Sequence, residues 1–301
     1  MRVESVSSAQ NRKVKTLLAL QEKARLRKEM GLFVVEGRRE LEHCVRAGFE
    51  IDTLFYCPEI AGLGIGTPLP ETSFGPLPSK LGPLPLTMPR VARFQGEESQ
   101  STNLSILENA GQIVEVTREI YEKIAYRGGT EGMIAEVKVR EMGLEDLELP
   151  ENPLVVVLEG VEKPGNLGAV LRSADAAGAD AVLVCDPLTD LYNPNLIRAS
   201  IGAVFTVPVA CCGSEEAIKW LKDNHINIYT AQLQDSSWYY DTDMTGGTAI
   251  VIGTEATGLT DVWRLAADAH IRIPMLGELD SLNASVSAAI LLYEAVRQRN
   301  V

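Results

Sequence analysis

The sequence has few potential metal ligands, with five cysteines and three histidines among 301 residues. No two cysteines form a C-x-x-C pair, the usual spacing of thiolates around zinc, so we predict no metal site. The adjacent Cys211 and Cys212 should point to opposite sides of a strand, and we expect them to be buried free thiols. No structural disulfide is expected.

Long hydrophobic runs are also missing. No stretch approaches the roughly 18 to 20 apolar residues that cross a bilayer, and the first 30 residues are charged rather than signal-like. We therefore expect a soluble, cytoplasmic protein. With 46% hydrophobic residues the chain can bury a substantial core, and its length suggests two domains or one large one.

The net charge of -13 argues against a polyanionic partner at long range. The charge is unevenly distributed, however. Residues 1–46 contain 11 Lys and Arg against 6 Asp and Glu, which leaves this segment at about +5 and the remainder at about -18. A basic N-terminal segment on an acidic body can still contact RNA locally.

The N-terminal half predicts alternating helices and strands interrupted by an insertion. We expect helices over 11–28, 39–47 and 118–125, and strands over 33–35, 51–56, 113–116 and 133–139. Residues 57–103 hold eight of the fifteen prolines and should form an extended insertion. The acidic segment 141–152 marks a domain boundary, which gives domains at 1–145 and 150–301.

The C-terminal half predicts an α/β fold. Short apolar strands alternate with helices, which indicates a mostly parallel sheet covered on both faces. The strands are expected at 154–158, 181–185, 207–210, 226–231, 249–253 and 271–273, and the helices from 167, near 195–202, near 215–224, near 261 and over 282–299.

A first polar cluster, Glu162 to Arg172, follows the strand at 154–158. Asn166 is placed to cap the next helix, which would be a structural role. Arg172 lies between apolar and small helix neighbours, which suggests close packing and a bound anion such as phosphate. An ion pair with Asp175 is the structural alternative.

Two further clusters also stand at strand ends, where open α/β sheets gather ligand-binding residues. Gly253 ends an apolar strand, where it permits close backbone approach by a ligand, and Glu255 follows it. The segment from Ile273 leads to Ser281, which could cap the final helix. A purely structural role can account for any one of these clusters, but it is harder to account for all three at strand ends in this way.

The motifs N-L-G-A-V-L-R at 166–172, G-T-E at 253–255 and I-P-M to S-L-N-A-S at 273–285 resemble those of the SpoU (TrmH) family of RNA ribose 2′-O-methyltransferases. Residues 11–38 resemble the family's small ribosomal-protein-like substrate-binding domain. The resemblance implies a trefoil-knotted C-terminal domain, an S-adenosylmethionine pocket in the knot and a homodimer formed through it. The chain has Lys163 where the family usually has Asp before the proline, and Ala284 where Val is common.

The resemblance also implies roles for individual residues. It assigns catalysis to Asn166, Arg172, Glu255, Ser281 and Asn283; binding of S-adenosylmethionine to Thr230, Gly253, Glu255, Ile273, Leu282 and Asn283; and RNA binding to Arg12, Lys13, Arg38 and Arg172. No metal is required. Arg172 would hold a phosphate and stabilise the developing alkoxide, while the general base stays open because guanidinium is very hard to deprotonate.

The function that follows is methyl transfer from S-adenosylmethionine to a ribose 2′-hydroxyl of a structured RNA, with ribosomal RNA favoured and transfer RNA as the alternative. A catalytically silent RNA-binding relative is a second class. A dinucleotide-binding oxidoreductase fits the sheet pattern but is disfavoured, because no Gly-x-Gly-x-x-Gly follows the first strand of the C-terminal half.

Overall fold

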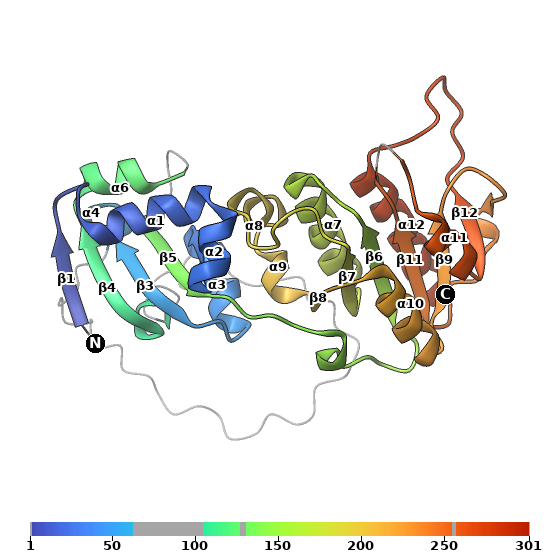
Figure 1. The fold of residues 1–301 in the computed structure, drawn as a ribbon, viewed down its shortest axis with the longest axis horizontal. Helices are drawn as coiled ribbons and strands as arrows, with labels where there is room; N and C mark the ends of the chain where they lie inside the picture. The colour runs from blue at the N-terminus through green and yellow to red at the C-terminus, as the bar shows by residue number, and fades with distance from the viewer. Residues whose placement is uncertain (1, 63–104, 127–130, 255–256, 301) are drawn as a thin grey trace.

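The computed structural model describes residues 2–62, 105–126, 131–254 and 257–300. Two sheets lie side by side along the long axis of the molecule (Figure 1). Most of the expected proline-rich insertion lies outside the described residues. None of the helices in the described ranges is long and apolar enough to cross a membrane.

The N-terminal sheet has five strands in the order β1-β4-β3-β5-β2. Its strands are β1 (Arg2–Val6), β2 (Leu32–Glu36), β3 (Ile51–Tyr56), β4 (Ala110–Val116) and β5 (Met133–Lys138). β4 runs parallel to both β1 and β3, whereas β5 is antiparallel to β2 and β3. The helices are α1 (Arg12–Glu22), α2 (Ala24–Met30), α3 (Arg38–Arg46), α4 (Pro58–Ala61) and α6 (Arg118–Ile124).

The single helix predicted over 11–28 is wrong, because the chain is extended at Lys23 and forms α1 and α2. The break turns Arg27 inward, where its side chain is only 3% exposed. Its guanidinium donates to the Leu20 carbonyl at 2.5 Å and pairs with Asp190 at 2.5 Å. These two partners offset much of the desolvation cost of burying the Arg27 charge. The break at Lys23 is what allows Arg27 to reach them.

The C-terminal sheet has seven strands in the order β10-β12-β9-β11-β6-β7-β8, and every pair is parallel. The α/β prediction is therefore confirmed. Its strands are β6 (Leu154–Glu159), β7 (Ala181–Cys185), β8 (Val209–Cys212), β9 (Asn227–Ala231), β10 (Ser237–Trp238), β11 (Thr248–Ile252) and β12 (Ala269–Arg272).

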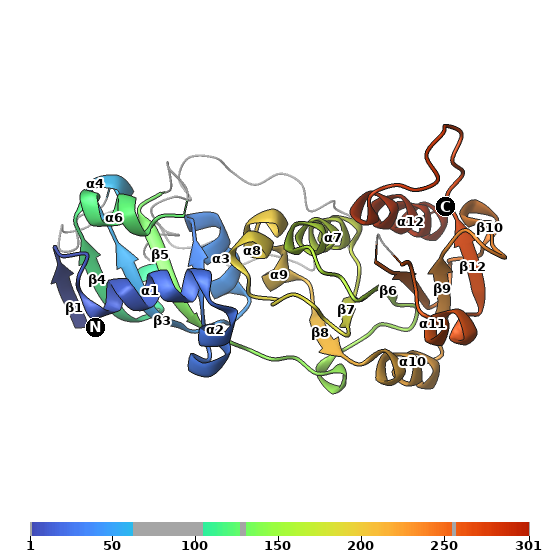
Figure 2. The same cartoon turned by 45° about the horizontal axis from the view of Figure 1, so that its top comes forward.

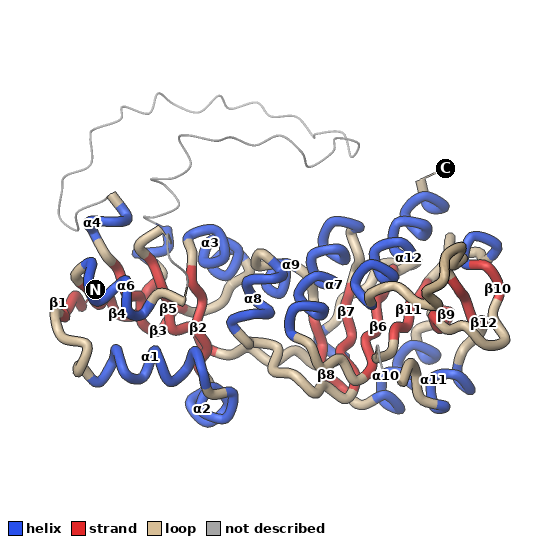
Figure 3. Tube along the Cα trace, turned by 90° about the horizontal axis from the view of Figure 1, so that it is seen from above, coloured by secondary structure: helices blue, strands red, loops and turns tan. Residues whose placement is uncertain are grey.

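Helices cover both faces of this sheet, as its continuous apolar strands require. The helices are α7 (Pro164–Ala177), α8 (Pro194–Ser200), α9 (Ala203–Thr206), α10 (Ser214–Asp223), α11 (Asp261–Ala266) and α12 (Ala284–Arg299), with short 3-10 turns η1 (Leu144–Asp146) and η2 (Tyr239–Asp241). Figure 3 shows α7 and α12 on one face and α10 and α11 on the other.

Both predicted helix caps are wrong. α7 begins at Pro164 with Lys163 as its N-cap residue, because proline suits the first helical turn, so Asn166 lies inside that turn. α12 is capped by Asn283, whose side chain accepts from the Ser285 amide, and not by Ser281.

The prediction that Cys211 and Cys212 are buried is also wrong. Cys211 is exposed and Cys212 is half-buried, although all five cysteines are free thiols. Both residues belong to β8, the edge strand of the sheet, which lies at one end of the strand order. An edge strand has a neighbouring strand on one side only, so its side chains are less completely covered.

An aromatic junction joins the two sheets. The ring of Phe33 from β2 stacks on Tyr192 with centroids 4.1 Å apart, and Phe49 meets Phe205 edge-on at 5.2 Å. The Tyr192 hydroxyl donates to the Arg140 carbonyl at 2.5 Å. Together with the Arg27–Asp190 pair, these contacts connect the two sheets through one core. Figure 2 shows α8 and α9 between α3 of the N-terminal part and α7 of the C-terminal part.

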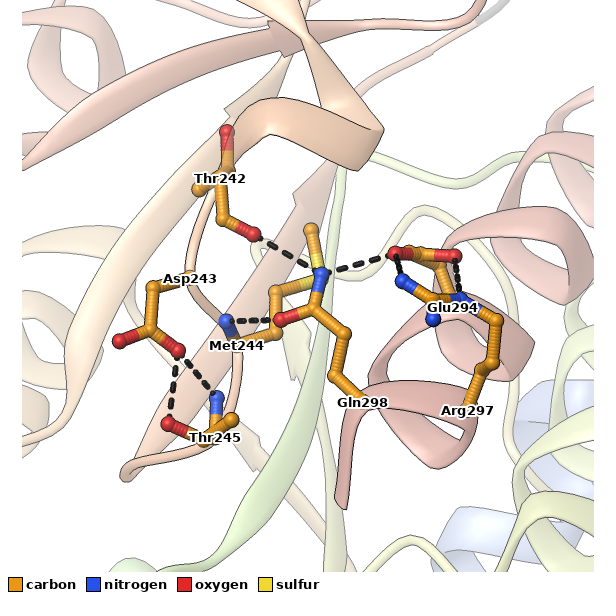
Figure 4. A network of polar contacts seen from close by, with 7 residues as sticks. All are labelled: Thr242, Asp243, Met244, Thr245, Glu294, Arg297 and Gln298. Atoms are coloured by element: carbon orange, nitrogen blue, oxygen red, sulfur yellow. Dashed lines mark hydrogen bonds and ion pairs between the residues drawn. The ribbon is translucent and has the colours of Figure 1, made fainter. Parts of the chain in front are cut away.

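A polar network fixes the C-terminal end of α12 to the loop before β11 (Figure 4). Gln298 accepts from the Met244 amide at 2.8 Å and donates to the Thr242 carbonyl at 3.0 Å. Glu294 accepts from Arg297 at 2.8 Å, and this guanidinium lowers the pKa of the carboxyl group. The network therefore orients the helix whose other end carries Asn283.

Candidate cofactor pocket and active site

A cavity of about 380 Å³ lies at the carboxyl edge of the C-terminal sheet. The ends of β9, β11 and β12 line it together with the loop from Ile273 to Leu282. Its volume is within the range of about 300 to 1,000 Å³ that is typical of small-molecule sites. The location follows from the parallel sheet, since strands of one direction bring their carboxyl ends to a common edge.

Gly253 is required by the backbone at this edge. A Cβ atom on Gly253 would lie 2.3 Å from the carbonyl carbon of Gly258, well inside van der Waals contact. Thr254 and Gly258 bond to each other through both amides, at 3.2 and 3.0 Å, which folds the turn back against the strand end. The contact that requires a glycine here is therefore with the chain's own turn, and Gly253 also lines the cavity. Glu255 lies outside the described residues.

Three buried polar atoms of residues that line this cavity have no hydrogen-bond partner among the described residues: Gln232 Oε1, Arg264 Nε and Arg272 Nε. Arg272 also lies over the Trp238 ring, 4.2 Å from its centroid. Buried polar groups usually have partners, so a cluster of unsatisfied ones indicates a ligand site. One acceptor and two cationic donors fit the ammonium and carboxylate groups of S-adenosylmethionine.

Asn166 and Asn283 meet beside the cavity. The side-chain amide of Asn283 donates to Asn166 Oδ1 at 3.2 Å, while its own oxygen accepts from the Ser285 hydroxyl at 2.6 Å. A smaller cavity of about 220 Å³, lined by Asn166, adjoins the larger one, since Gly253, Thr254 and Ala284 line both. The fold thus brings the first and third sequence clusters together.

Of the other predicted cofactor and catalytic residues, Ile273, Ser281 and Leu282 line the larger cavity. Ser281 donates to Asp280 at 3.2 Å. Thr230 is fully buried and shares a hydrogen bond of 2.7 Å with His270, so the described cavity wall at the end of β9 is formed by Ala231 and Gln232.

Arg172 lies six positions after Asn166 in α7, on the wall of a different cavity. It is exposed, so the expected close packing is wrong. The alternative pair with Asp175 does not form either, because Asp175 accepts from Thr206 at 2.6 Å. Arg172 makes no hydrogen bond or ion pair with any residue that the structure describes, and its guanidinium is available to an anion.

The predicted RNA-binding residues of the N-terminal half lie around α1 and α3. Arg12 is exposed at the start of α1. Lys13 forms an ion pair of 2.6 Å with Glu4, which offsets its charge. Arg38 opens α3, and its amide donates to Glu131 at 2.6 Å.

Sequence reasoning missed Gln232, Arg264 and Arg272. A signal existed for two of them, because Gln232 follows the last residue of β9 and Arg272 ends β12. Applying the strand-end rule to every parallel strand would have identified both. Within the described ranges no group of three His, Cys, Asp or Glu side chains is arranged to hold a metal.

Comparison with protein families gives two matches. Residues 153–293 match the SpoU rRNA methylase family, and residues 11–67 match the MRM3-like substrate binding domain. The 23S rRNA guanosine 2′-O-methyltransferase of Vibrio parahaemolyticus is 36% identical over 193 residues, which span 62% of this chain and 78% of that enzyme. A 23S rRNA uridine 2′-O-methyltransferase of Streptomyces viridochromogenes is 36% identical over 173 residues, 54% of this chain and 60% of that protein.

Solved structures resemble the whole chain. A crystal structure of an RNA 2′-O ribose methyltransferase is 34% identical with a TM-score of 0.74, and the match covers 99% of this chain and all of that one. An S-adenosylmethionine-bound rRNA methyltransferase from Sinorhizobium meliloti is 26% identical with a TM-score of 0.79, and the match covers 98% of each chain.

Proposed function

Because the chain belongs to the SpoU rRNA methylase family, we propose that it transfers a methyl group from S-adenosylmethionine to a ribose 2′-hydroxyl of ribosomal RNA. The observation that carries the proposal is the cavity at the carboxyl edge, with its three unsatisfied polar atoms and the Asn166–Asn283 pair beside it. Both relatives compared above are named as 23S rRNA 2′-O-methyltransferases, which favours ribosomal over transfer RNA.

The cofactor side of the site consists of strand ends. When bound, S-adenosylmethionine supplies an electrophilic methyl group on its sulfonium. Arg264 and Arg272 would hold its carboxylate and Gln232 would accept from its ammonium group, since their buried Nε and Oε1 atoms have no partner among the described residues. Gly253, Ile273 and Leu282 form the remaining walls.

The RNA side of the site depends on positioning, because the ribose oxygen must align with the methyl group. Asn166 and Asn283 orient the ribose, each held by the other. Arg172 binds an RNA phosphate and stabilises negative charge, and it does not remove the hydroxyl proton, because a guanidinium stays protonated. Ser281 and Glu255 order the surrounding loops.

We also propose a domain division at 141–152, a trefoil knot in the C-terminal domain, a homodimer and a cytoplasmic location. The resemblance to the family is what supports the knot, since the fold matches solved methyltransferase structures along the whole chain. Exposed apolar side chains at Leu276, Leu279 and Val286 support a dimer contact at this end of the molecule.

Calorimetry of the full chain with S-adenosylmethionine, combined with transfer of labelled methyl to ribosomal and transfer RNA, tests the function. We expect cofactor binding and transfer to ribosomal RNA. Binding without transfer to either RNA would instead support a silent RNA-binding relative.

Arg172→Ala should abolish transfer and largely preserve cofactor binding, since Arg172 lies outside the cofactor cavity. Arg118→Ala, an exposed arginine paired with Glu122, is the matched control and should leave transfer unchanged. Undiminished transfer by Arg172→Ala would overturn its role.

A further inference from the structure

A cavity of about 600 Å³ lies between the two sheets. α7 and α8 of the C-terminal part form one wall. The other wall comes from β2, the start of α3, Tyr126 and Glu131. This cavity and the cofactor pocket lie at different places along α7, because Arg172 lines the first and Asn166 adjoins the second.

The C-terminal wall is cationic. Arg172 and Arg198 come from α7 and α8, whereas Arg39 of α3 places a third guanidinium beside the carboxylates of the opposite wall. Arg39 and Arg198 are exposed, and neither forms an ion pair with a described residue. Guanidinium groups with open donor sites bind phosphate in a fixed geometry.

The opposite wall is acidic, with carboxylates of Glu36, Glu40 and Glu131. Glu36 accepts from the Tyr126 amide at 2.9 Å, and Glu131 accepts from the Arg38 amide at 2.6 Å. Acidic groups repel a phosphate but accept hydrogen bonds from an amino group. The two walls therefore suit the two ends of one nucleotide.

Tyr126 joins the walls. Its hydroxyl donates to Asn195 at 3.4 Å, and the guanidinium carbon of Arg198 lies 5.7 Å from the centroid of its ring. The side chain is still 50% exposed, although it lines the cavity. A half-exposed aromatic ring beside an arginine is the usual platform for stacking an unpaired base.

We propose that this cavity binds one unpaired nucleotide of the RNA, next to the nucleotide that is methylated. Its phosphate lies on Arg172 and Arg198, its base stacks on Tyr126, and the amino edge of the base faces Glu40. The site prefers adenine, guanine or cytosine to uracil, because uracil has no amino group. The inference rests on the proposed function for the identity of the RNA, but binding at this cavity does not depend on methyl transfer.

The two cavities are close enough for neighbouring nucleotides. Asn166 and Arg172 are separated by six residues of α7, which corresponds to about 9 Å along a helix axis. One side of the helix would thus hold the reacting ribose and the other would hold its neighbour in the RNA.

Fluorescence anisotropy of the full chain with labelled hexaadenylate and hexauridylate tests the proposal. We expect tighter binding of hexaadenylate, and we expect Tyr126→Ala to weaken it roughly tenfold, within the range for loss of one base–aromatic stack. Tyr126→Phe should retain most of the affinity. Tyr240→Ala is the matched control, since Tyr240 is 47% exposed and does not line this cavity.

Two further variants separate charge from recognition. Arg198→Ala should weaken the binding of both oligonucleotides and reduce the slope of log affinity against log salt concentration by about one. Glu40→Gln should bring the two affinities closer together, because the amide is a poorer acceptor for the base amino group. A hexaadenylate containing one 8-azidoadenosine should crosslink to the segment around Tyr126, which locates the base without any substitution.

The outcomes distinguish this inference from the proposed function. If cofactor binding and methyl transfer are intact but Tyr126→Ala and Arg198→Ala bind hexaadenylate as the unchanged chain does, the inference is overturned and the function stands. If oligonucleotide binding depends on both residues but no methyl is transferred, the proposed function fails and the cavity remains an RNA site. A crosslink confined to residues outside the cavity would also overturn the inference.

Discussion

Glu136 offers a sharp test of the electrostatics of the N-terminal sheet. It lies on β5, is only 5% exposed, and its Oε1 has no hydrogen-bond partner among the described residues. Burial, reinforced by the nearby negative charge of Asp52 and opposed by Lys13, raises the pKa of its carboxyl group to about 7. Glu136→Gln retains the shape of the side chain and removes the charge.

The magnitude follows from the difference between this pKa and the ordinary value of 4.5. Each pH unit corresponds to about 1.4 kcal/mol, so the ionised carboxylate costs the folded state up to about 3.5 kcal/mol. Because the folded-state pKa is raised, the stability from the protonated form is fully present below pH 4.5 and is lost as pH rises to about 7.

Urea unfolding of both chains at pH 5 and pH 8, followed by circular dichroism, measures the effect. We expect Glu136→Gln to raise the free energy of unfolding by about 2 to 3 kcal/mol more at pH 8 than at pH 5. Glu50→Gln, in the same part of the fold, is the control. Lys138 lowers the pKa of the Glu50 carboxyl group, so removing that charge should not stabilise the folded protein at pH 8. If Glu136→Gln changed the free energy of unfolding by the same amount at pH 5 and pH 8, the reasoning would be refuted.

Further predictions concern the pocket, the RNA surface and α12. Gly253→Ala should prevent cofactor binding in calorimetry, because its Cβ would collide with the Gly258 turn. Arg272→Ala should weaken cofactor binding roughly tenfold or more while the fold, checked by circular dichroism, is retained. Arg12 and Lys15 are both exposed on α1, and replacing them together by alanine should reduce the salt slope of RNA binding by up to about two in anisotropy. Gln298→Ala should lower the free energy of unfolding by about 1 to 2 kcal/mol, since it removes partners from Met244 and Thr242.

The sequence predicted the α/β sheet of the C-terminal half well, because its strands are continuous apolar runs. Leu154 to Leu158 and Ala249 to Ile252 are buried and lie where the pattern placed them. The short strand β10 was missed, since two residues form no recognisable period. Strand β1 was missed because Arg2 to Val6 alternates polar and apolar residues over too short a length.

The candidate site was predicted in part. The pairing of Asn166 with Asn283 joins residues 117 positions apart, and only the family resemblance placed them together. The environment of Arg172 was misjudged, because its sequence neighbours are buried while its own side chain points into the gap between the sheets. That gap depends on how two separately folded sheets pack, which no local pattern encodes.

The aromatic junction between the sheets has a consequence for how a target nucleotide is selected. With Phe33 stacked on Tyr192 and Arg27 paired with Asp190, the N-terminal part is braced against the methyltransferase part and does not act as a tethered arm. The two parts of such a molecule keep a constant separation. The distance from a recognised RNA feature to the methylated ribose is then fixed by the protein, and inserting one nucleotide between them should move the modification to the next position along the RNA.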